Sequence, residues 1–316
     1  KGAYAKVISV STQTLKLASA NAQAHILLGK AYYETEQMEK AVSEFKIVLK
    51  GQPDNEEIKK LLDVSKIEKV TVKEMGLWKS DYFIIDFDSE DEQQKKLVRA
   101  VLIALENAYE NIGKDLHFYP DTRTKVFIYS REEYAKLKGV VEWSIGLYKP
   151  DTKEILISLY DVEKQPMELI LSTLWHETTH LFIDVLTKGN CPLWLNEGFA
   201  EYQENKKAKA QLSWKPVKKA VQKGSLYTLK ELESSFMKIK DKDRVNLAYL
   251  QSLAAVEYII SKYDLRGLRK IFKELGQGRA INEALIIGTK SDYENLERNY
   301  KNYLKKEYSL KKRNEK

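Results

Sequence analysis

Helical spacing of apolar residues dominates the two ends of the chain, and a shorter period appears in a middle segment. There the apolar residues run continuously or alternate, as they do in strands. One amphipathic helix is expected within this segment, over residues 91–112, and Gly113 is expected to end it. The expected strands cover residues 82–87, 125–129, 143–148 and 154–158, and a short helix covers residues 132–137. The middle segment therefore predicts a small sheet.

The longest uninterrupted helical pattern follows this sheet. Pro166 suits the first helical position and Gly189 suits the stop, and neither Pro nor Gly occurs between them. The apolar positions with helical spacing are Leu169, Ile170, Leu174, Leu181, Phe182 and Val185. The pattern predicts one long helix that is mostly buried.

The part of the chain after Tyr202 is almost wholly helical in its pattern. Thr228 and Glu231 have the spacing of a capping box. The expected helices cover residues 246–263, 265–275, 281–287 and 292–308. We expect this helical half to form the second wall of a cleft.

Near the start, residues 22–53 have the spacings of one helix–turn–helix repeat of the tetratricopeptide kind. The matching positions are Leu28, Gly29, Tyr32, Ala41, Phe45 and Pro53. Residues 2–7 fit the second helix of a preceding repeat, and residues 54–74 are expected to form a solvent-exposed helix and a linker. Two interpretations stay open: a docking groove for a protein partner, or a structural cap.

Composition is that of a soluble globular protein with room for two or three domains. Of 316 residues, 43% are hydrophobic and 31% are charged, and no apolar run is long enough to span a membrane. The formal net charge of +7 comes mostly from lysines spread along the chain. No basic cluster is interleaved with aromatic residues, so we expect no nucleic-acid partner.

The remaining special residues change this picture little. The chain begins at Lys1 and is expected to be a fragment or a processed form. Its single cysteine, Cys191, cannot form an internal disulfide and is interpreted as a packing or turn residue. The cytoplasm, the cell envelope and a secreted address all stay open. His25 and His117 are interpreted as structural histidines.

Candidate chemistry lies on the long helix. His176 and His180 are four positions apart, so both rings leave one face of a helix about one turn apart and can bind one metal ion. Glu177 can approach the open side of that metal without being a ligand. This is the His-Glu-x-x-His arrangement of zinc proteases, in which the glutamate is the general base. The competing interpretation is a pair of core histidines with other partners.

A catalytic zinc site needs a third protein ligand and an open position for water. Glu197 is the best candidate, because the intervening residues suffice for the end of one helix, a turn and the start of another, with Pro192 near that start. Glu201 lies four positions later on the same helical face. We assign Glu201 to the second shell, where it accepts the distal N–H of a ligand histidine, His176 by preference.

The two motifs together resemble a known family. His176–His180, followed by the segment Pro192–Tyr202 with its Asn-Glu-Gly-Phe-Ala-Glu-Tyr run, resemble the gluzincin metallopeptidases, and most closely their peptidase MA-like family. The resemblance covers roughly residues 75–305 and is strongest at the two motifs. It implies one Zn²⁺ ion held by His176, His180 and Glu197, with Glu177 as the catalytic base.

Two further roles follow only from this resemblance. Residues 247–252 are similar to a later helix that carries a tyrosine near the scissile carbonyl, which implies Tyr249 as the oxyanion donor. The segment 146–158 would supply the edge strand that pairs with an extended substrate. One departure concerns the Gly-x-Met-Glu-Asn strand of the aminopeptidases, since this chain has only Pro166–Leu169 in a helix start.

The sequence thus predicts an α+β, zincin-like metallopeptidase domain preceded by a helical repeat segment. Residues 1–68 form the repeat segment, 75–205 the catalytic subdomain with a small mixed sheet and the site helix, and 206–316 a helical subdomain. The predicted function is zinc-dependent hydrolysis of peptide bonds in a peptide or protein substrate. The alternative is a zinc-domain scaffold with little or no activity that binds protein partners through the repeats.

Overall fold

The structure is a computed structural model, and it describes most of the chain. The described residues are 2–35, 37–59, 61–62, 65, 76–87, 92–137, 144–158, 167–208, 212–233, 236, 239 and 241–310. Pro166 and residues 66–74 of the expected linker lie outside them. The chain forms two compact units, one of residues 1–78, 86–94 and 129–142, the other of residues 79–85, 95–128 and 143–316. Each unit is described by itself.

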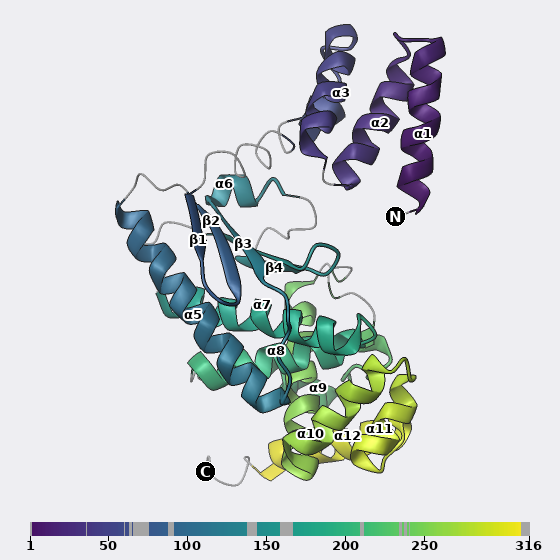
Figure 1. The fold of residues 1–316 in the computed structure, drawn as a ribbon. Coiled ribbons are helices and arrows are strands. Elements are labelled where there is room, and N and C mark those ends of the chain that lie inside the picture. Colours follow the sequence, from purple (N-terminus) through teal and green to yellow (C-terminus); the bar gives the residue numbers. More distant parts are fainter. Residues whose placement is uncertain are drawn as a thin grey trace. The chain divides into compact units, whose positions relative to one another are not determined.

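Three helices form the repeat segment of the first unit: α1 (Gly2–Leu17), α2 (Ala22–Glu34) and α3 (Met38–Gly51) (Figure 1). Gly29 lets α2 and α3 approach, since a Cβ there would lie 2.6 Å from a ring carbon of Phe45. The expectation of a solvent-exposed helix after residue 54 is wrong for two residues. Ile58 and Leu62 are 0% and 7% exposed and join the core around Phe45, because their spacing places both on one helical face.

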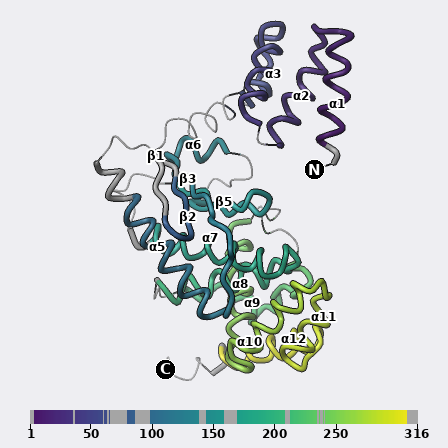
Figure 2. Tube along the Cα trace, in the orientation of Figure 1, coloured from purple at the N-terminus to yellow at the C-terminus, as the bar shows by residue number. Residues whose placement is uncertain are grey.

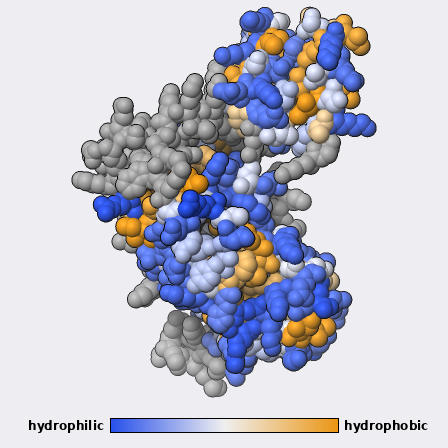
Figure 3. Space-filling view, in the orientation of Figure 1, coloured by the Kyte–Doolittle hydropathy of each residue, from blue (hydrophilic) through white to orange (hydrophobic). Residues whose placement is uncertain are grey.

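Apolar side chains also remain on the surface of this segment, where Figure 3 shows them scattered among polar ones. Val10 and Leu17 of α1 and Leu27 of α2 are exposed. The second helix is fixed at its start by Asn21, whose side chain accepts a hydrogen bond from the Ala24 N–H. The predicted helix–turn–helix repeat is confirmed.

A five-stranded sheet runs in the order β1-β2-β3-β5-β4. Its strands are β1 (Gly76–Lys79), β2 (Phe83–Phe87), β3 (Thr124–Tyr129), β4 (Gly146–Lys149) and β5 (Glu154–Ser158). The last two form an antiparallel hairpin in which Tyr148 lies opposite Ile155, and β4 is an edge strand of the sheet. The sequence predicted four of these strands and missed β1. The short helix α6 (Arg131–Tyr134) follows β3.

The helix between β2 and β3 is longer than the pattern predicts. Helix α5 (Glu92–Leu116) continues through Gly113, and the chain leaves the helical path at His117, whose φ is 51°. The predicted stop is wrong because Gly113 serves packing instead. A Cβ there would lie 2.0 Å from a ring carbon of Tyr119.

Two helices lie side by side: α7 (Met167–Thr187), which packs on the hairpin, and α8 (Leu193–Ala208) (Figure 1). The first ends as predicted, because Lys188 and Gly189 both have positive φ and the Gly189 N–H bonds back to the Asp184 carbonyl at 3.0 Å. The second packs closely on a later helix. A Cβ at Gly198 would lie 2.2 Å from the Ser252 carbonyl oxygen.

The C-terminal half is helical, as the pattern predicts (Figure 2). Its elements are α9 (Lys215–Lys223), η1 (Glu231–Glu233), α10 (Lys242–Gly276), α11 (Ile281–Thr289) and α12 (Tyr293–Leu310). Thr228 and Glu231 form the expected reciprocal capping bonds. Asp264 breaks α10, with a φ of 49°, where the sequence predicts a gap between two helices. Among the described residues, no helix is long and apolar enough to cross a membrane. The predicted fold class is confirmed.

Candidate metal centre

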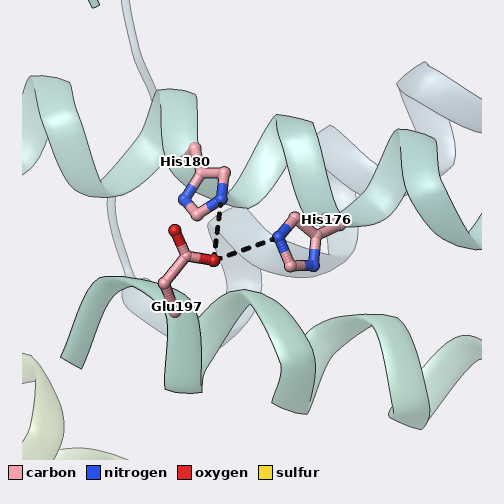
Figure 4. Close-up of side chains that lie close together, drawn as sticks. All are labelled: His176, His180 and Glu197. Atoms are coloured by element: carbon pink, nitrogen blue, oxygen red, sulfur yellow. Dashed lines mark ion pairs between the residues drawn. The ribbon is translucent and has the colours of Figure 1, made fainter. Parts of the chain in front are cut away.

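Helices α7 and α8 bring three side chains to one point (Figure 4). The Nε2 atoms of His176 and His180 lie 3.5 and 3.6 Å from the same Glu197 carboxylate oxygen, Oε2. The two rings come from successive turns of α7, with their centroids 4.7 Å apart. The potential ligand atoms of the three residues lie within 4.8 Å of one another. The structure therefore places all three sequence-predicted ligands together.

The far side of each ring is fixed by a hydrogen bond. The Nδ1–H of His176 donates to Glu204 Oε2 at 3.0 Å. The Nδ1–H of His180 donates to Asn196 Oδ1 at 2.9 Å. Each bond places a proton on Nδ1, so Nε2 is the nitrogen of each ring that a metal ion could bind. Both Nε2 atoms face the Glu197 carboxylate.

The carboxylate that holds His176 is not the predicted one. Glu201 Oε1 lies 4.0 Å from His176 Nδ1, beyond hydrogen-bond distance, whereas Glu204 makes the bond. Both glutamates follow Glu197 on one helical face, and the second is one turn nearer the start of α7. Ser172 Oγ also donates to Glu204 Oε1 at 2.9 Å, which holds that side chain in place. The prediction that Glu201 accepts the distal N–H of His176 is therefore wrong, and Glu204 accepts it.

Glu177 is the most enclosed of the acidic side chains at this point, with 7% of the residue exposed. Burial raises the pKa of its carboxyl, while His176, His180 and the Tyr148 amide act against that rise. The Tyr148 N–H donates to Glu177 Oε2 at 2.7 Å. A buried carboxylate with a raised pKa has the basicity that proton uptake near neutral pH requires.

Tyr249 of α10 lies within the electrostatic reach of the same group. Burial raises the pKa of its phenol well above the usual value, and Glu197, Glu201 and Glu177 add to that rise. The ring also packs edge-on against Phe236, with centroids 5.0 Å apart. The phenol therefore keeps its proton.

Charge around the three ligands favours a cation. Burial alone would raise the pKa of Glu197, but the two imidazoles outweigh it and the net shift is downward. Burial raises the pKa of Glu201 to about 7, and Glu204 and Glu197 add to that shift. The carboxylates of Glu177, Glu197, Glu201 and Glu204 outnumber the two imidazoles, so a divalent ion would offset the excess of negative charge. Nitrogen and oxygen donors in this number match the ligand set of catalytic zinc.

Comparison with known families agrees with this geometry. A family model described as Peptidase MA superfamily matches residues 109–306, which is more than half of the chain. The chain belongs to the peptidase MA superfamily. A second family model, a tetratricopeptide repeat, matches residues 1–63. No curated protein matches the chain.

The remaining candidate residues belong to no metal-binding group among the residues that the structure describes. His25 is in the repeat segment, where Glu44 and the Ser19 carbonyl accept from its two nitrogens. Cys191 is partly buried, and burial, together with the charge of Glu197, raises the pKa of its thiol. Among the described residues, the groups able to hold a metal contain neither His25, His117 nor Cys191.

Sequence reasoning missed three residues that shape the site of the peptidase MA domain. Glu204 lies seven positions after Glu197 and so shares its helical face, a signal that the spacing contained. Asn196 is adjacent to Glu197, and only the approach of α8 to α7 shows that its amide reaches His180. Tyr148 acts through its main chain, for which no residue type gives a signal.

Proposed function

We propose that the peptidase MA domain is a zinc-dependent peptidase. The observation that carries the proposal is the convergence of two histidine Nε2 atoms on one Glu197 oxygen while both Nδ1 atoms are hydrogen-bonded on the far side. A pair of core histidines that binds no metal does not require both Nε2 atoms to lie near one carboxylate oxygen. His176, His180 and Glu197 would hold one Zn²⁺ ion, which would polarise the substrate carbonyl and make bound water more acidic.

Glu177 is the general base in this proposal. Its Oε2 is held by the Tyr148 N–H, so we assign proton uptake to Oε1. Because its pKa is raised by burial, the carboxyl can hold a proton between taking it from water and giving it to the leaving amine. Its position beside His176 on α7 keeps it next to the ligands without making it one.

Tyr249 supports the proposal as donor to the developing oxyanion. Its raised phenol pKa keeps the hydroxyl protonated across the working pH range. A neutral hydroxyl in a buried place stabilises negative charge as that charge appears in the transition state. Helix α10 carries Tyr249 and packs on α8, so the donor is fixed relative to Glu197.

The substrate class follows from the edge strand. Strand β4 lies at one end of the sheet and packs on α7 directly beside Glu177. An extended peptide can pair with the main chain of such a strand, which selects shape more than side-chain sequence. We therefore propose peptides or unfolded protein segments as substrates, and a protein partner for the tetratricopeptide repeat.

The test compares Glu177→Gln with wild type. Purified protein is assayed for zinc content and for cleavage of casein, with and without a chelator and added zinc. Cleavage should fall roughly a thousandfold in the variant while zinc content stays unchanged. Glu257→Gln is the matched control, because Glu257 is also a glutamate with a pKa raised by burial and has no part in the proposed site.

Two outcomes would contradict the proposal. Equal cleavage by Glu177→Gln and wild type would refute the assigned base. Zinc at full occupancy without chelator-sensitive cleavage would favour the alternative function, a zinc-domain scaffold that binds partners through its repeat segment, which the tetratricopeptide match supports.

A further inference from the structure

One carboxylate on α7 takes no part in the site described above. Asp184 lies one turn beyond His180, and only 11% of its side chain is exposed. It accepts a hydrogen bond from the Tyr148 hydroxyl at 2.8 Å and forms an ion pair with the Lys153 ammonium group. A single carboxylate thus holds two side chains that approach α7 from outside the helix.

Both of these side chains belong to the β4–β5 hairpin. Tyr148 is on β4, and Lys153 is in the loop that joins the strands. Lys153 has a φ of 59°, in the left-handed region that favours glycine. A lysine is present there, and its side chain reaches Asp184. The conformation of the hairpin loop therefore brings the Lys153 ammonium group to the Asp184 carboxylate.

The main chain of the same tyrosine contacts the proposed base. The carbonyl groups of Ile145 and Lys149 accept hydrogen bonds from the β5 side of the hairpin. Because main-chain groups alternate in direction along an antiparallel strand, the N–H of Tyr148 faces away from β5. That N–H, from Tyr148, donates to Glu177 Oε2 at 2.7 Å. The tyrosine thus joins the hairpin to α7 twice, through its amide at Glu177 and through its hydroxyl at Asp184.

Space at this contact leaves little freedom. A Cβ at Gly146 would lie 2.9 Å from Glu177 Oε1 and 2.5 Å from Thr173 Cγ2. At Gly146 the backbone of β4 therefore rests directly on the Thr173 and Glu177 side chains of α7. A small movement of the strand would change the distance from the Tyr148 amide to the carboxylate.

We propose that Asp184 is a positioning residue for the general base. By holding the Tyr148 phenol and the Lys153 ammonium group, it keeps β4 at the distance from α7 at which the Tyr148 amide binds Glu177. The inference rests on the proposed function, because it takes Glu177 as the base. It also limits how a substrate pairs with β4: the Tyr148 N–H is committed to Glu177, so an extended peptide uses other main-chain groups of the strand.

Hydrogen exchange of the hairpin amides tests the contact without using activity. In Asp184→Ala, the Tyr148 amide should exchange at least about tenfold faster than in wild type, because its strand is no longer held. Tyr148→Phe, which loses only the hydroxyl, should show a smaller increase. Asp115→Asn is the matched control: Asp115 also binds a lysine and is similarly buried, with 14% of its side chain exposed, but it pairs with Lys206 and Gln203. It should leave the Tyr148 amide unchanged.

Kinetics of the same variants separates positioning from folding. Asp184→Ala should lower kcat between about tenfold and a hundredfold with little change in KM, since a displaced base slows the chemical step. Asp184→Asn should recover most of that loss, because its amide oxygen can still accept from the Tyr148 hydroxyl. Zinc affinity should stay within about twofold of wild type in all these variants, since no ligand is altered.

Each result decides between the proposal and its alternatives. Wild-type exchange of the Tyr148 amide in Asp184→Ala would overturn the proposal, as would a fall in kcat no larger than that of Asp115→Asn. If Asp184→Ala does not fold, Tyr148→Phe and Lys153→Gly decide by the same two measurements. If wild-type protein cleaves no peptide, the proposed function fails, and hydrogen exchange still decides whether Asp184 holds the hairpin on Glu177.

Discussion

Two buried histidines, one in each compact unit, show how alike a structural and a metal-ready imidazole can be. His25 in the repeat segment and His176 in the peptidase MA domain both donate from Nδ1 to a glutamate, Glu44 and Glu204 respectively. The other nitrogen separates them. His25 Nε2 binds the Ser19 carbonyl at 2.9 Å, whereas His176 Nε2 faces Glu197 at 3.5 Å together with a second histidine.

The surroundings of Nε2, rather than burial or the glutamate at Nδ1, therefore distinguish the structural histidine from the candidate ligand. With acceptors on both nitrogens, His25 favours a proton on each, and its pKa is raised even though burial opposes the charged form. His176 shares its focus with His180, so a metal ion can satisfy both at once.

Removal of the imidazoles should give the largest effect. His180→Gln should reduce bound zinc from about one ion per chain to nearly none and abolish peptide cleavage, because a catalytic zinc site needs its three protein ligands. His25→Gln should leave both quantities unchanged. Elemental analysis of the purified proteins measures the first, and casein cleavage the second. Zinc loss in the His25 variant would remove the distinction drawn between the two histidines.

Removal of the glutamate partners should give an intermediate effect. Glu204→Gln should weaken zinc binding about tenfold to a hundredfold, because the His176 ring loses the acceptor that orients it. Glu44→Gln, the matched change in the repeat segment, should leave zinc affinity unaltered. Competition with a zinc-sensitive dye measures both. If Glu201→Gln weakens zinc binding more than Glu204→Gln does, Glu204 is not the carboxylate that orients the His176 ring.

The pH dependence of the repeat segment should give the smallest effect. The folded-state pKa of His25 lies above 6.5, because the bonds to Glu44 and the Ser19 carbonyl outweigh burial. Its contribution to stability is then fully present below pH 6.5 and is lost as pH rises through the folded value. Hydrogen exchange of α2 should report a loss of stability, of about 1 kcal/mol in total, as pH rises above the unfolded-state value. The same segment in His25→Gln should show no such loss.

Much of the fold follows from sequence because its signals are local. The spacing of apolar residues gave the long site helix, and residues with positive φ near Gly189 end it as expected. The prediction that the helix ends at Gly113 was wrong, because this glycine leaves room for the Tyr119 ring and the helix continues past it. Ile58 and Leu62 were assigned to an exposed helix because charge dominates their neighbourhood, while their burial depends on contacts with the repeat core.

The candidate site was predictable where it depends only on the spacing of residues along a single helix. His176, His180 and Glu197 follow from spacing, and the structure brings their ligand atoms together. The choice between Glu201 and Glu204 was not predictable, because both lie on the same face and only the offset of α8 along α7 decides which reaches the imidazole. The hydrogen bond from the Tyr148 amide to Glu177 was not predictable for the same reason, because it depends on how β4 packs on α7.

The bare backbone at Gly198 has a consequence for how the ligand set is held. This residue follows Glu197 directly, and it rests on the Ser252 carbonyl of a helix that begins only at residue 242. The two histidines and the glutamate all precede that helix in the chain. A polypeptide cut after residue 208 would therefore contain every donor atom and lack the surface against which the third donor is seated. The proposed ligands all lie within residues 176–197, but the surface on which the third of them rests belongs to α10, residues 242–276.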